Sequence, residues 1–194
     1  MHEKRACLSD QIISEQALKN KGGIIMNPIL FLDIDGVLNP PICPQYELDF
    51  ALSDKLAAKL NNPSIKKLNI YFVNQVYYGF DKKSCELIKK LAQEFEAKIV
   101  LTSSWRLYYT KEEIEGMFEI VGIKDTFIDF TVHGNPRNNV IMEYVHTHNV
   151  KRYLVIDDFD MRNNFGYRFI QTAQCFNEAN YHQARYALKL QESL

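Results

Sequence analysis

The chain has 194 residues, with 23 basic and 24 acidic side chains and a net charge of −1. This length suits one domain with a sizeable core, and the balanced charge gives no strong field for nucleic acid or a membrane surface. Because no stretch approaches the roughly 18 apolar residues of a membrane span and the N-terminus lacks the apolar core of a signal peptide, we expect a soluble, cytoplasmic or otherwise intracellular protein. The four scattered cysteines are expected to be free thiols.

The chain is expected to divide near residue 26. Residues 1–25 are predicted to be an N-terminal extension, for which a peripheral helix ranks first, ahead of a leader or an extended start. Met26-Asn27-Pro28 then directly precedes an apolar run. We therefore place the folded domain at residues 26–194.

The first half of the domain begins with a predicted strand over residues 29–33. Pro40-Pro41-Ile42-Cys43-Pro44 is too rich in proline for regular structure. The leucines of residues 51–60 have helical spacing, whereas residues 68–78 are aromatic and favour β-structure. Asp81 is predicted to cap a helix whose apolar stripe runs from Leu87 to Phe95.

The second half alternates strands and helices. Strands are predicted at 98–102, 127–132, 153–156 and 168–171, and helices at 111–118, from Asn135-Pro136-Arg137 onward (Asn as cap, Pro in the first turn) and at 177–190. This alternation predicts an α/β fold, a Rossmann-like, doubly wound, mostly parallel sheet with flanking helices. Residues 40–79 are the only region for a small cap insertion.

Two carboxylates separated by one residue end the first strand, in the run Ile29-Leu30-Phe31-Leu32-Asp33-Ile34-Asp35-Gly36. Open α/β sheets bind ligands at the C-terminal ends of their strands, and side chains two apart share a side. One aspartate can attack a phosphorus atom while the other transfers protons. The alternative is an acidic turn after a strand.

Hydroxyl groups end the second predicted strand, at Thr102, Ser103 and Ser104. Hydroxyls and free amides at such a junction suit a phosphate group, although capping of the strand end explains them equally well in isolation. Trp105 is expected to pack in the core, and Arg106 to meet a phosphate or a surface acid.

Asp157-Asp158 ends the strand predicted at 153–156 and offers oxygen ligands for Mg²⁺. A divalent ion relieves the repulsion between adjacent aspartates. Phosphoryl transfer also needs a protein cation, and two candidates compete. Arg137 lies at a helix start, whereas Lys151 precedes the strand and so lies at its far end. Geometry favours Arg137, with a solvated surface arginine as the alternative.

Together these motifs, from Asp33-Ile-Asp35-Gly-Val-Leu-Asn to Asp157-Asp158, resemble the haloacid dehalogenase (HAD) superfamily in order and spacing over roughly residues 28–176. Ser103-Ser104-Trp105-Arg106 and the arginine helix before Asp-Asp look most like a small phosphatase-like subfamily associated with nucleic-acid-repair polyproteins. Two departures matter: Val37 replaces a common threonine, and Arg137 replaces the usual lysine with a different geometry.

The resemblance implies a Mg²⁺-dependent phosphatase that forms an aspartyl-phosphate. Asp33 is then the nucleophile and a metal ligand, and Asp35 the general acid and base, with its backbone carbonyl also on the metal. Asp157 binds Mg²⁺ with Asp158 in support. The implied phosphate-binding residues are Thr102, Ser103 and Arg137.

The short cap segment leaves the cleft open, which favours a large substrate. Its aromatic side chains, which include Tyr71, Tyr77 and Tyr78, can flank a flat group or pack on the core as a β-ribbon. We expect a phosphoprotein substrate, with phosphotyrosine as the sharper hypothesis. A nucleotide or nucleic-acid end is less favoured because the chain has no basic excess. The third alternative is a catalytically silent interaction module.

Overall fold

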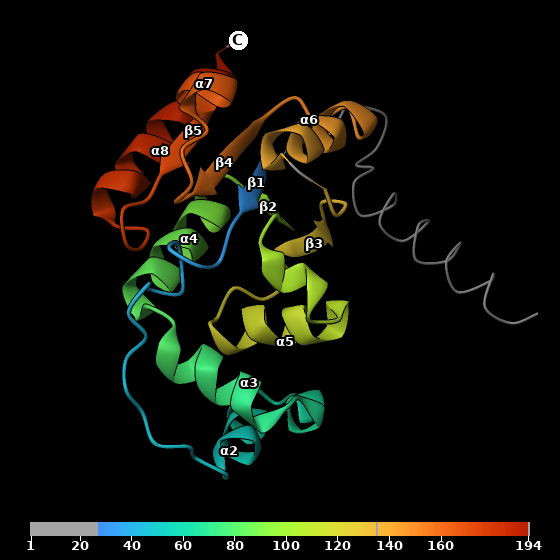
Figure 1. Cartoon of the computed structure of the whole chain (residues 1–194), viewed down its shortest axis with the longest axis vertical. Helices are drawn as coiled ribbons and strands as arrows, with labels where there is room; N and C mark the ends of the chain where they lie inside the picture. Colours follow the sequence, from blue (N-terminus) through green and yellow to red (C-terminus); the bar gives the residue numbers. More distant parts are fainter. Residues whose placement is uncertain (1–26, 135, 194) are drawn as a thin grey trace, which may run out of the picture.

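The computed structural model describes residues 27–134 and 136–193. The peripheral helix predicted within residues 1–25 lies outside this part of the chain. In the described part, five parallel strands form one sheet in the order β3-β2-β1-β4-β5 (Figure 1). The strands are β1 (Ile29–Leu32), β2 (Lys98–Leu101), β3 (Phe127–Phe130), β4 (Tyr153–Asp157) and β5 (Phe169–Gln171). The predicted doubly wound α/β fold is confirmed.

The strand register decides which residues leave the sheet together. Strand β1 is buried along its whole length, as expected of a central parallel strand covered on both faces. Its last residue, Leu32, pairs with Leu101 of β2 and Ile156 of β4. The next residue along each of the three strands therefore emerges at one level of the sheet edge. These residues are Asp33, Thr102 and Asp157.

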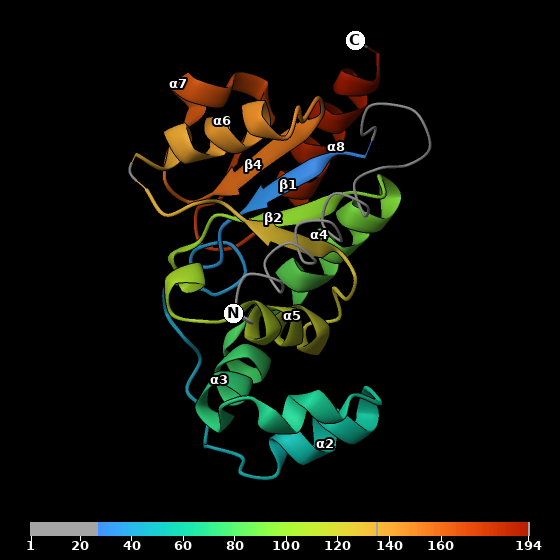
Figure 2. The same ribbon diagram turned by 90° about the vertical axis from the view of Figure 1, so that its right-hand side faces the viewer.

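Helices cover both faces of the sheet (Figure 2). Leu30 and Leu32 of β1 pack with α4 (Lys82–Glu94), α5 (Lys111–Ile120) and α8 (Glu178–Glu192). Ile29 and Phe31 face the other way, toward α6 (Arg137–Thr147) and α7 (Arg162–Phe165). Short 3₁₀ turns lie at η3 (Ser104–Leu107) and η4 (Gly166–Arg168). This alternation follows from the two-residue period of a strand.

The helix starts largely agree with the sequence prediction. The Asp81 side chain caps α4 by accepting a hydrogen bond from the Ser84 amide at 2.7 Å. Helix α6 differs by one position, because it begins at Arg137 and Pro136 occupies the cap position without a side-chain bond. The proposed cap residue Asn135 lies outside the described residues. Every helix in the described ranges is too short or too polar to cross a membrane.

The cap segment, residues 40–79, contains the helix predicted near 51–60, α2 (Leu52–Lys59), followed by the 3₁₀ helix η1 (Pro63–Lys67). The β-structure predicted for 68–78 is wrong, because this stretch forms α3 (Ile70–Asn74) and the π-helical turn η2 (Gln75–Gly79). The Asn69 side chain caps α3. Phe72, Val73 and Val76 are buried at helical spacing, so packing overrides β-propensity and no β-ribbon forms there.

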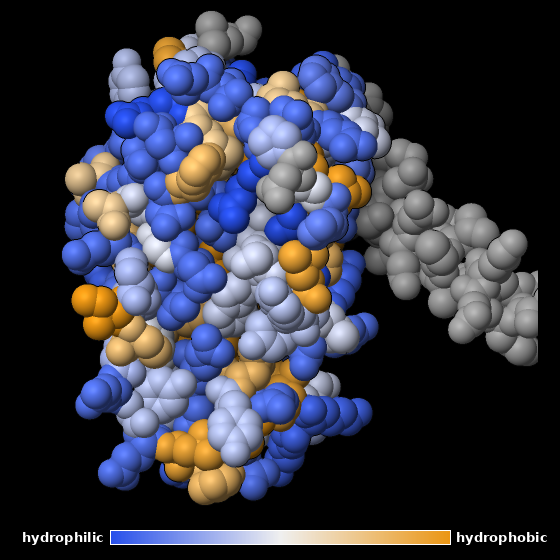
Figure 3. Space-filling view, viewed as in Figure 1, coloured by the Kyte–Doolittle hydropathy of each residue, from blue (hydrophilic) through white to orange (hydrophobic). Residues whose placement is uncertain are grey.

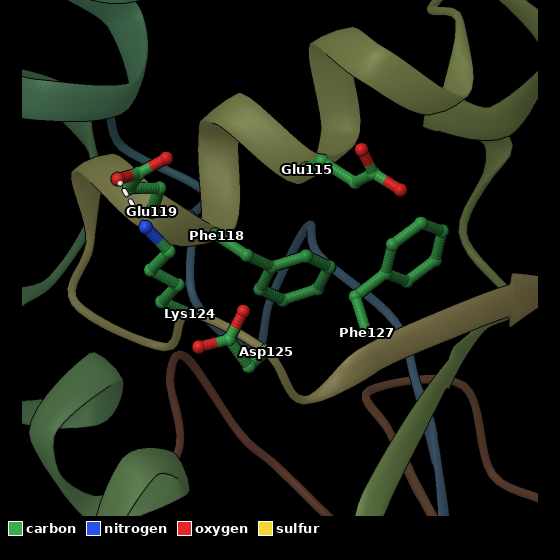
Figure 4. A pocket seen from close by; sticks show the side chains of 6 residues that line it. All are labelled: Glu115, Phe118, Glu119, Lys124, Asp125 and Phe127. Atoms are coloured by element: carbon green, nitrogen blue, oxygen red, sulfur yellow. Dashed lines mark hydrogen bonds and ion pairs between the residues drawn. The ribbon is translucent and has the colours of Figure 1, made fainter. Parts of the chain in front are cut away.

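Helix α5 fastens the cap segment to the core. A Cβ atom on Gly116 would lie 2.7 Å from Leu68 Cδ1, so only glycine lets Leu68 pack this closely. The Asn62 side chain donates a hydrogen bond to Glu119 Oε2 at 2.5 Å. Glu119 also pairs with Lys124 beside a cavity of about 280 Å³ between α5 and the start of β3 (Figure 4). In Figures 1 and 2, α2 and α3 lie beyond α5, at the far end of the molecule from α7.

Candidate active site

Asp33 is held in a fixed orientation directly after β1. Its amide donates to the Ile156 carbonyl at 3.0 Å, which extends the β1–β4 pairing by one residue. Its Oδ1 atom accepts from the Ile34 amide at 2.9 Å, and its Oδ2 atom accepts from Arg137 Nη1 at 2.8 Å. The side chain is only 6% exposed. A buried carboxylate with both oxygens oriented in this way suits a nucleophile or a metal ligand.

Asp157 lies beside Asp33 and is fully buried. Its Oδ1 atom accepts from the Phe159 amide at 2.9 Å, and its Oδ2 atom accepts from Arg137 Nη1 at 2.5 Å. Burial and the neighbouring Asp33 carboxylate both raise the pKa of Asp157 above its usual range, although Arg137 opposes the shift. A positive ion here would remove most of this cost.

One oxygen from each of Asp33, Asp157 and Asp158 lies within 4.8 Å of the others. Mg²⁺ prefers carboxylate oxygens and keeps several of its water molecules. Two buried carboxylates and one exposed carboxylate suit such an ion, because the exposed side stays open to water. Three carboxylates against the single guanidinium of Arg137 also leave an excess of negative charge. The donor set therefore fits a divalent cation.

Arg137, at the first turn of α6, contacts both buried carboxylates through one nitrogen. Burial opposes its charge, but Asp33 and Asp157 outweigh burial and raise the pKa of the guanidinium. Lys151 lies before β4, at the opposite end of the strand from Asp157. Of the two cations considered from the sequence, the structure thus places Arg137 at the carboxylates.

Thr102 and Ser103 follow β2 and are both fully buried. The Ser103 hydroxyl accepts from the Trp105 amide at 3.4 Å, whereas the Thr102 hydroxyl has no hydrogen-bond partner among residues 27–134 and 136–193. A buried hydroxyl without a partner costs about 1–3 kcal/mol. An incoming phosphoryl oxygen would supply the missing partner, so this orphaned group fits a phosphate site.

Asp35 is exposed, and its carboxylate is held by two side chains outside the three-aspartate group. Its Oδ1 atom accepts from Asn39 Nδ2 at 2.7 Å, and its Oδ2 atom accepts from the indole Nε1 of Trp105 at 3.0 Å. Sequence reasoning assigned Trp105 to packing alone and missed this contact. Asp35 is therefore held separately, two residues after the buried Asp33.

A family model described as the HAD domain in Swiss Army Knife RNA repair proteins matches residues 29–178. The chain belongs to this HAD family. The match confirms the resemblance that the motifs indicated, and its range includes every candidate site residue. No curated protein and no solved structure matches the chain.

Within this HAD domain, Arg106 is held by backbone carbonyls rather than by the surface acid that the sequence offered as one partner, and the other partner, a phosphate, stays a prediction. Its guanidinium donates to the backbone carbonyls of Thr102, Ser103, Thr131 and Val132. Arg106 therefore joins the ends of β2 and β3 and fixes the loop that carries the two hydroxyls. The fork of five donors in arginine explains why this position suits arginine better than lysine.

Gly36 directly follows Asp35, and the structure shows why glycine suits this position. Gly36 has a φ of +72°, and a Cβ atom there would lie 2.6 Å from Asp158 Oδ2. Its carbonyl accepts a hydrogen bond from the Thr172 hydroxyl at 2.7 Å. The tight turn after Asp35 thus lets the Asp158 carboxylate lie against the backbone next to Asp33.

Proposed function

We propose that this HAD domain hydrolyses phosphomonoesters with the help of a divalent cation, Mg²⁺ being the expected ion, through an aspartyl-phosphate on Asp33. The observation that carries the proposal is the position of Asp33. It lies within a group of three carboxylates and is bonded to Arg137. Such a centre suits a dianionic substrate only when the carboxylates are balanced by positive charge.

Two half-reactions account for the proposed hydrolysis. In the first, an Asp33 oxygen forms a bond to phosphorus, the ester P–O bond breaks, and Asp35 gives its proton to the leaving oxygen. In the second, Asp35 takes a proton from water as the water oxygen attacks phosphorus, and Asp33 is released as a carboxylate. Two features support these roles: the Asp33 side chain is buried, and Asp35 is exposed to solvent.

The remaining residues would orient the phosphoryl group. Thr102 offers its unpartnered hydroxyl, Ser103 lies next to it, and Arg137 has further N–H groups beyond the two bonds to Asp33 and Asp157. Asp33, Asp157 and Asp158, with the Asp35 carbonyl, would hold the cation. When bound, the cation neutralises carboxylate and phosphoryl charge during transfer.

For the substrate, we propose the phosphorylated end of a nucleic acid. The support is the family, whose description refers to RNA repair proteins. A phosphoprotein, with phosphotyrosine foremost, was favoured from the sequence because the chain lacks a basic excess; nothing in the structure or the family supports it, and it stays a prediction. The silent interaction module is disfavoured because each expected catalytic position carries a competent side chain.

The first test is turnover of p-nitrophenyl phosphate by the full chain, with Mg²⁺ and with excess chelator, beside Asp33→Asn. Metal-dependent turnover that the variant lacks would support the proposed mechanism. Turnover by Asp33→Asn at the wild-type rate would exclude Asp33 as nucleophile. Oligoribonucleotides phosphorylated at the 3′ or 5′ end, compared with a phosphotyrosine peptide by kcat/KM, would then decide the substrate class.

A further inference from the structure

Trp105 is the only tryptophan of the chain, and it makes an unusual contact. The side chain is almost fully buried, yet its indole N–H donates to the exposed Asp35 carboxylate at 3.0 Å. An indole has one donor and no acceptor. Because a buried donor without a partner is costly, this single bond ties the orientation of Asp35 to the orientation of the ring.

The ring itself is held by aromatic neighbours from the cap segment and from the chain that follows it. Ring centroids lie 6.1 Å away for Phe72 of α3, 5.5 Å for Phe80 and 5.2 Å for Tyr109. Phe72 and Tyr109 also contact each other, at 4.5 Å. Trp105 cannot turn without displacing this cluster, because interiors are close-packed. The cap segment thus reaches Asp35 through one indole ring.

Asp35 needs such support because it is solvent-exposed. A free aspartate at the surface samples several rotamers, and proton transfer requires the donor within hydrogen-bond reach of the leaving oxygen. Asn39 holds Oδ1 and Trp105 holds Oδ2. Each oxygen keeps a second lone pair, so the two bonds fix the carboxyl group while leaving room for the transferred proton.

We infer that Trp105 is a positioning residue that holds Asp35 for proton transfer to the leaving group, and that the cap segment acts on catalysis through this ring. The inference rests on the proposed function and deepens it. Trp105 touches neither substrate nor cation in this scheme. Its effect must therefore appear wherever the reaction depends on Asp35, and must be absent where it does not.

The basicity of the leaving group separates reactions that depend on Asp35 from reactions that do not. Phenolate resembles the tyrosine side chain, with a pKa of about 10, and needs a proton as it departs. p-Nitrophenolate is far less basic and departs with little help. The ratio kcat/KM reports only steps through the transfer of phosphoryl to Asp33, so the later attack of water does not contribute. A misplaced Asp35 should slow phenyl phosphate much more than p-nitrophenyl phosphate.

The experiment compares Trp105→Phe with wild type on both esters in saturating Mg²⁺. We expect kcat/KM for phenyl phosphate to fall on the order of tenfold, a fraction of the 10²–10⁴ that general acid–base catalysis contributes, and that for p-nitrophenyl phosphate to change less than about twofold. Phe118→Leu is the matched control, because it removes a buried ring that packs on Phe127 rather than on Trp105. Its ratio between the two esters should stay at the wild-type value.

A second variant covers the case in which Trp105→Phe does not fold. Because the chain has a single tryptophan, growth of a tryptophan auxotroph on benzothienylalanine replaces only this N–H with sulfur and keeps the shape of the ring. We expect the same selective loss on phenyl phosphate, with a melting temperature close to wild type.

Equal losses on both esters, or no loss on either, would overturn the inference while leaving the aspartyl-phosphate mechanism intact. Failure of the mechanism is seen separately, because wild type would then show no metal-dependent turnover or Asp33→Asn would keep it. That result would overturn the inference as well.

Discussion

Arg137 Nη1 donates to Asp33 Oδ2 at 2.8 Å, across 104 residues of sequence, and the same nitrogen donates to Asp157. This contact joins the first turn of α6 to the ends of β1 and β4. It also leaves two buried carboxylates sharing one positive charge. The stability of the site and its need for a cation are therefore linked.

Arg137→Ala should destabilise the fold as well as stop turnover. Removal of the guanidinium leaves Asp33 and Asp157 buried without a charged partner, which should lower the free energy of unfolding by about 2 kcal/mol. Denaturant unfolding measures this, and Mg²⁺ should recover part of the loss. Arg162→Ala is the control, because its pair with Asp160 is exposed and screened by solvent. Equal effects of the two substitutions would contradict the assigned role.

Asp35→Asn should slow both half-reactions on the order of 10²-fold for esters with a basic leaving group, because the amide neither gives nor takes the required proton. A good leaving group still departs in the first step, so phosphorylated Asp33 should accumulate. Rapid-quench measurement with p-nitrophenyl phosphate should then show a burst of one p-nitrophenolate per chain. Asp33→Asn should give no burst. A wild-type steady-state rate in Asp35→Asn would remove Asp35 from the mechanism.

The parallel sheet and the positions of Asp33, Thr102 and Asp157 at one sheet edge could be predicted from sequence, because each residue ends an apolar run and parallel strands bring such ends together. The helical form of residues 68–78 could not be predicted from the sequence. Tyr, Phe and Val favour strands locally, and only contact with α5 and the core decides for helix. The Trp105–Asp35 bond spans 70 residues, and no local pattern indicates where an indole N–H points.

The raised pKa of Asp157 predicts that the free energy of unfolding depends on pH, and a divalent cation should weaken this dependence. Burial and Asp33 raise its pKa in the folded state, so the folded chain binds more protons than the unfolded chain above the ordinary Asp value of about 3.9. The stability that this group contributes is then complete below that value and is lost as pH rises through the raised pKa. The difference in unfolding free energy between wild type and Asp157→Asn, measured across this range without divalent ions, isolates the contribution. A difference that grows in favour of wild type with rising pH would contradict the sign.

Gly36→Ala should lower the affinity for Mg²⁺ in addition to lowering the free energy of unfolding. The positive φ of Gly36 costs an alanine about 1 kcal/mol, and the added Cβ would also lie 2.6 Å from Asp158 Oδ2 and push that carboxylate aside. Gly122→Ala is the matched control, because Gly122 has a similar φ of +80° and the nearest atom to its Cβ would be 3.8 Å away. Both variants should lose stability, but titration calorimetry with Mg²⁺ should show weaker binding only in Gly36→Ala. Unchanged Mg²⁺ affinity in Gly36→Ala would mean that Asp158 does not hold the cation, and that Asp33 and Asp157 carry it without a third carboxylate.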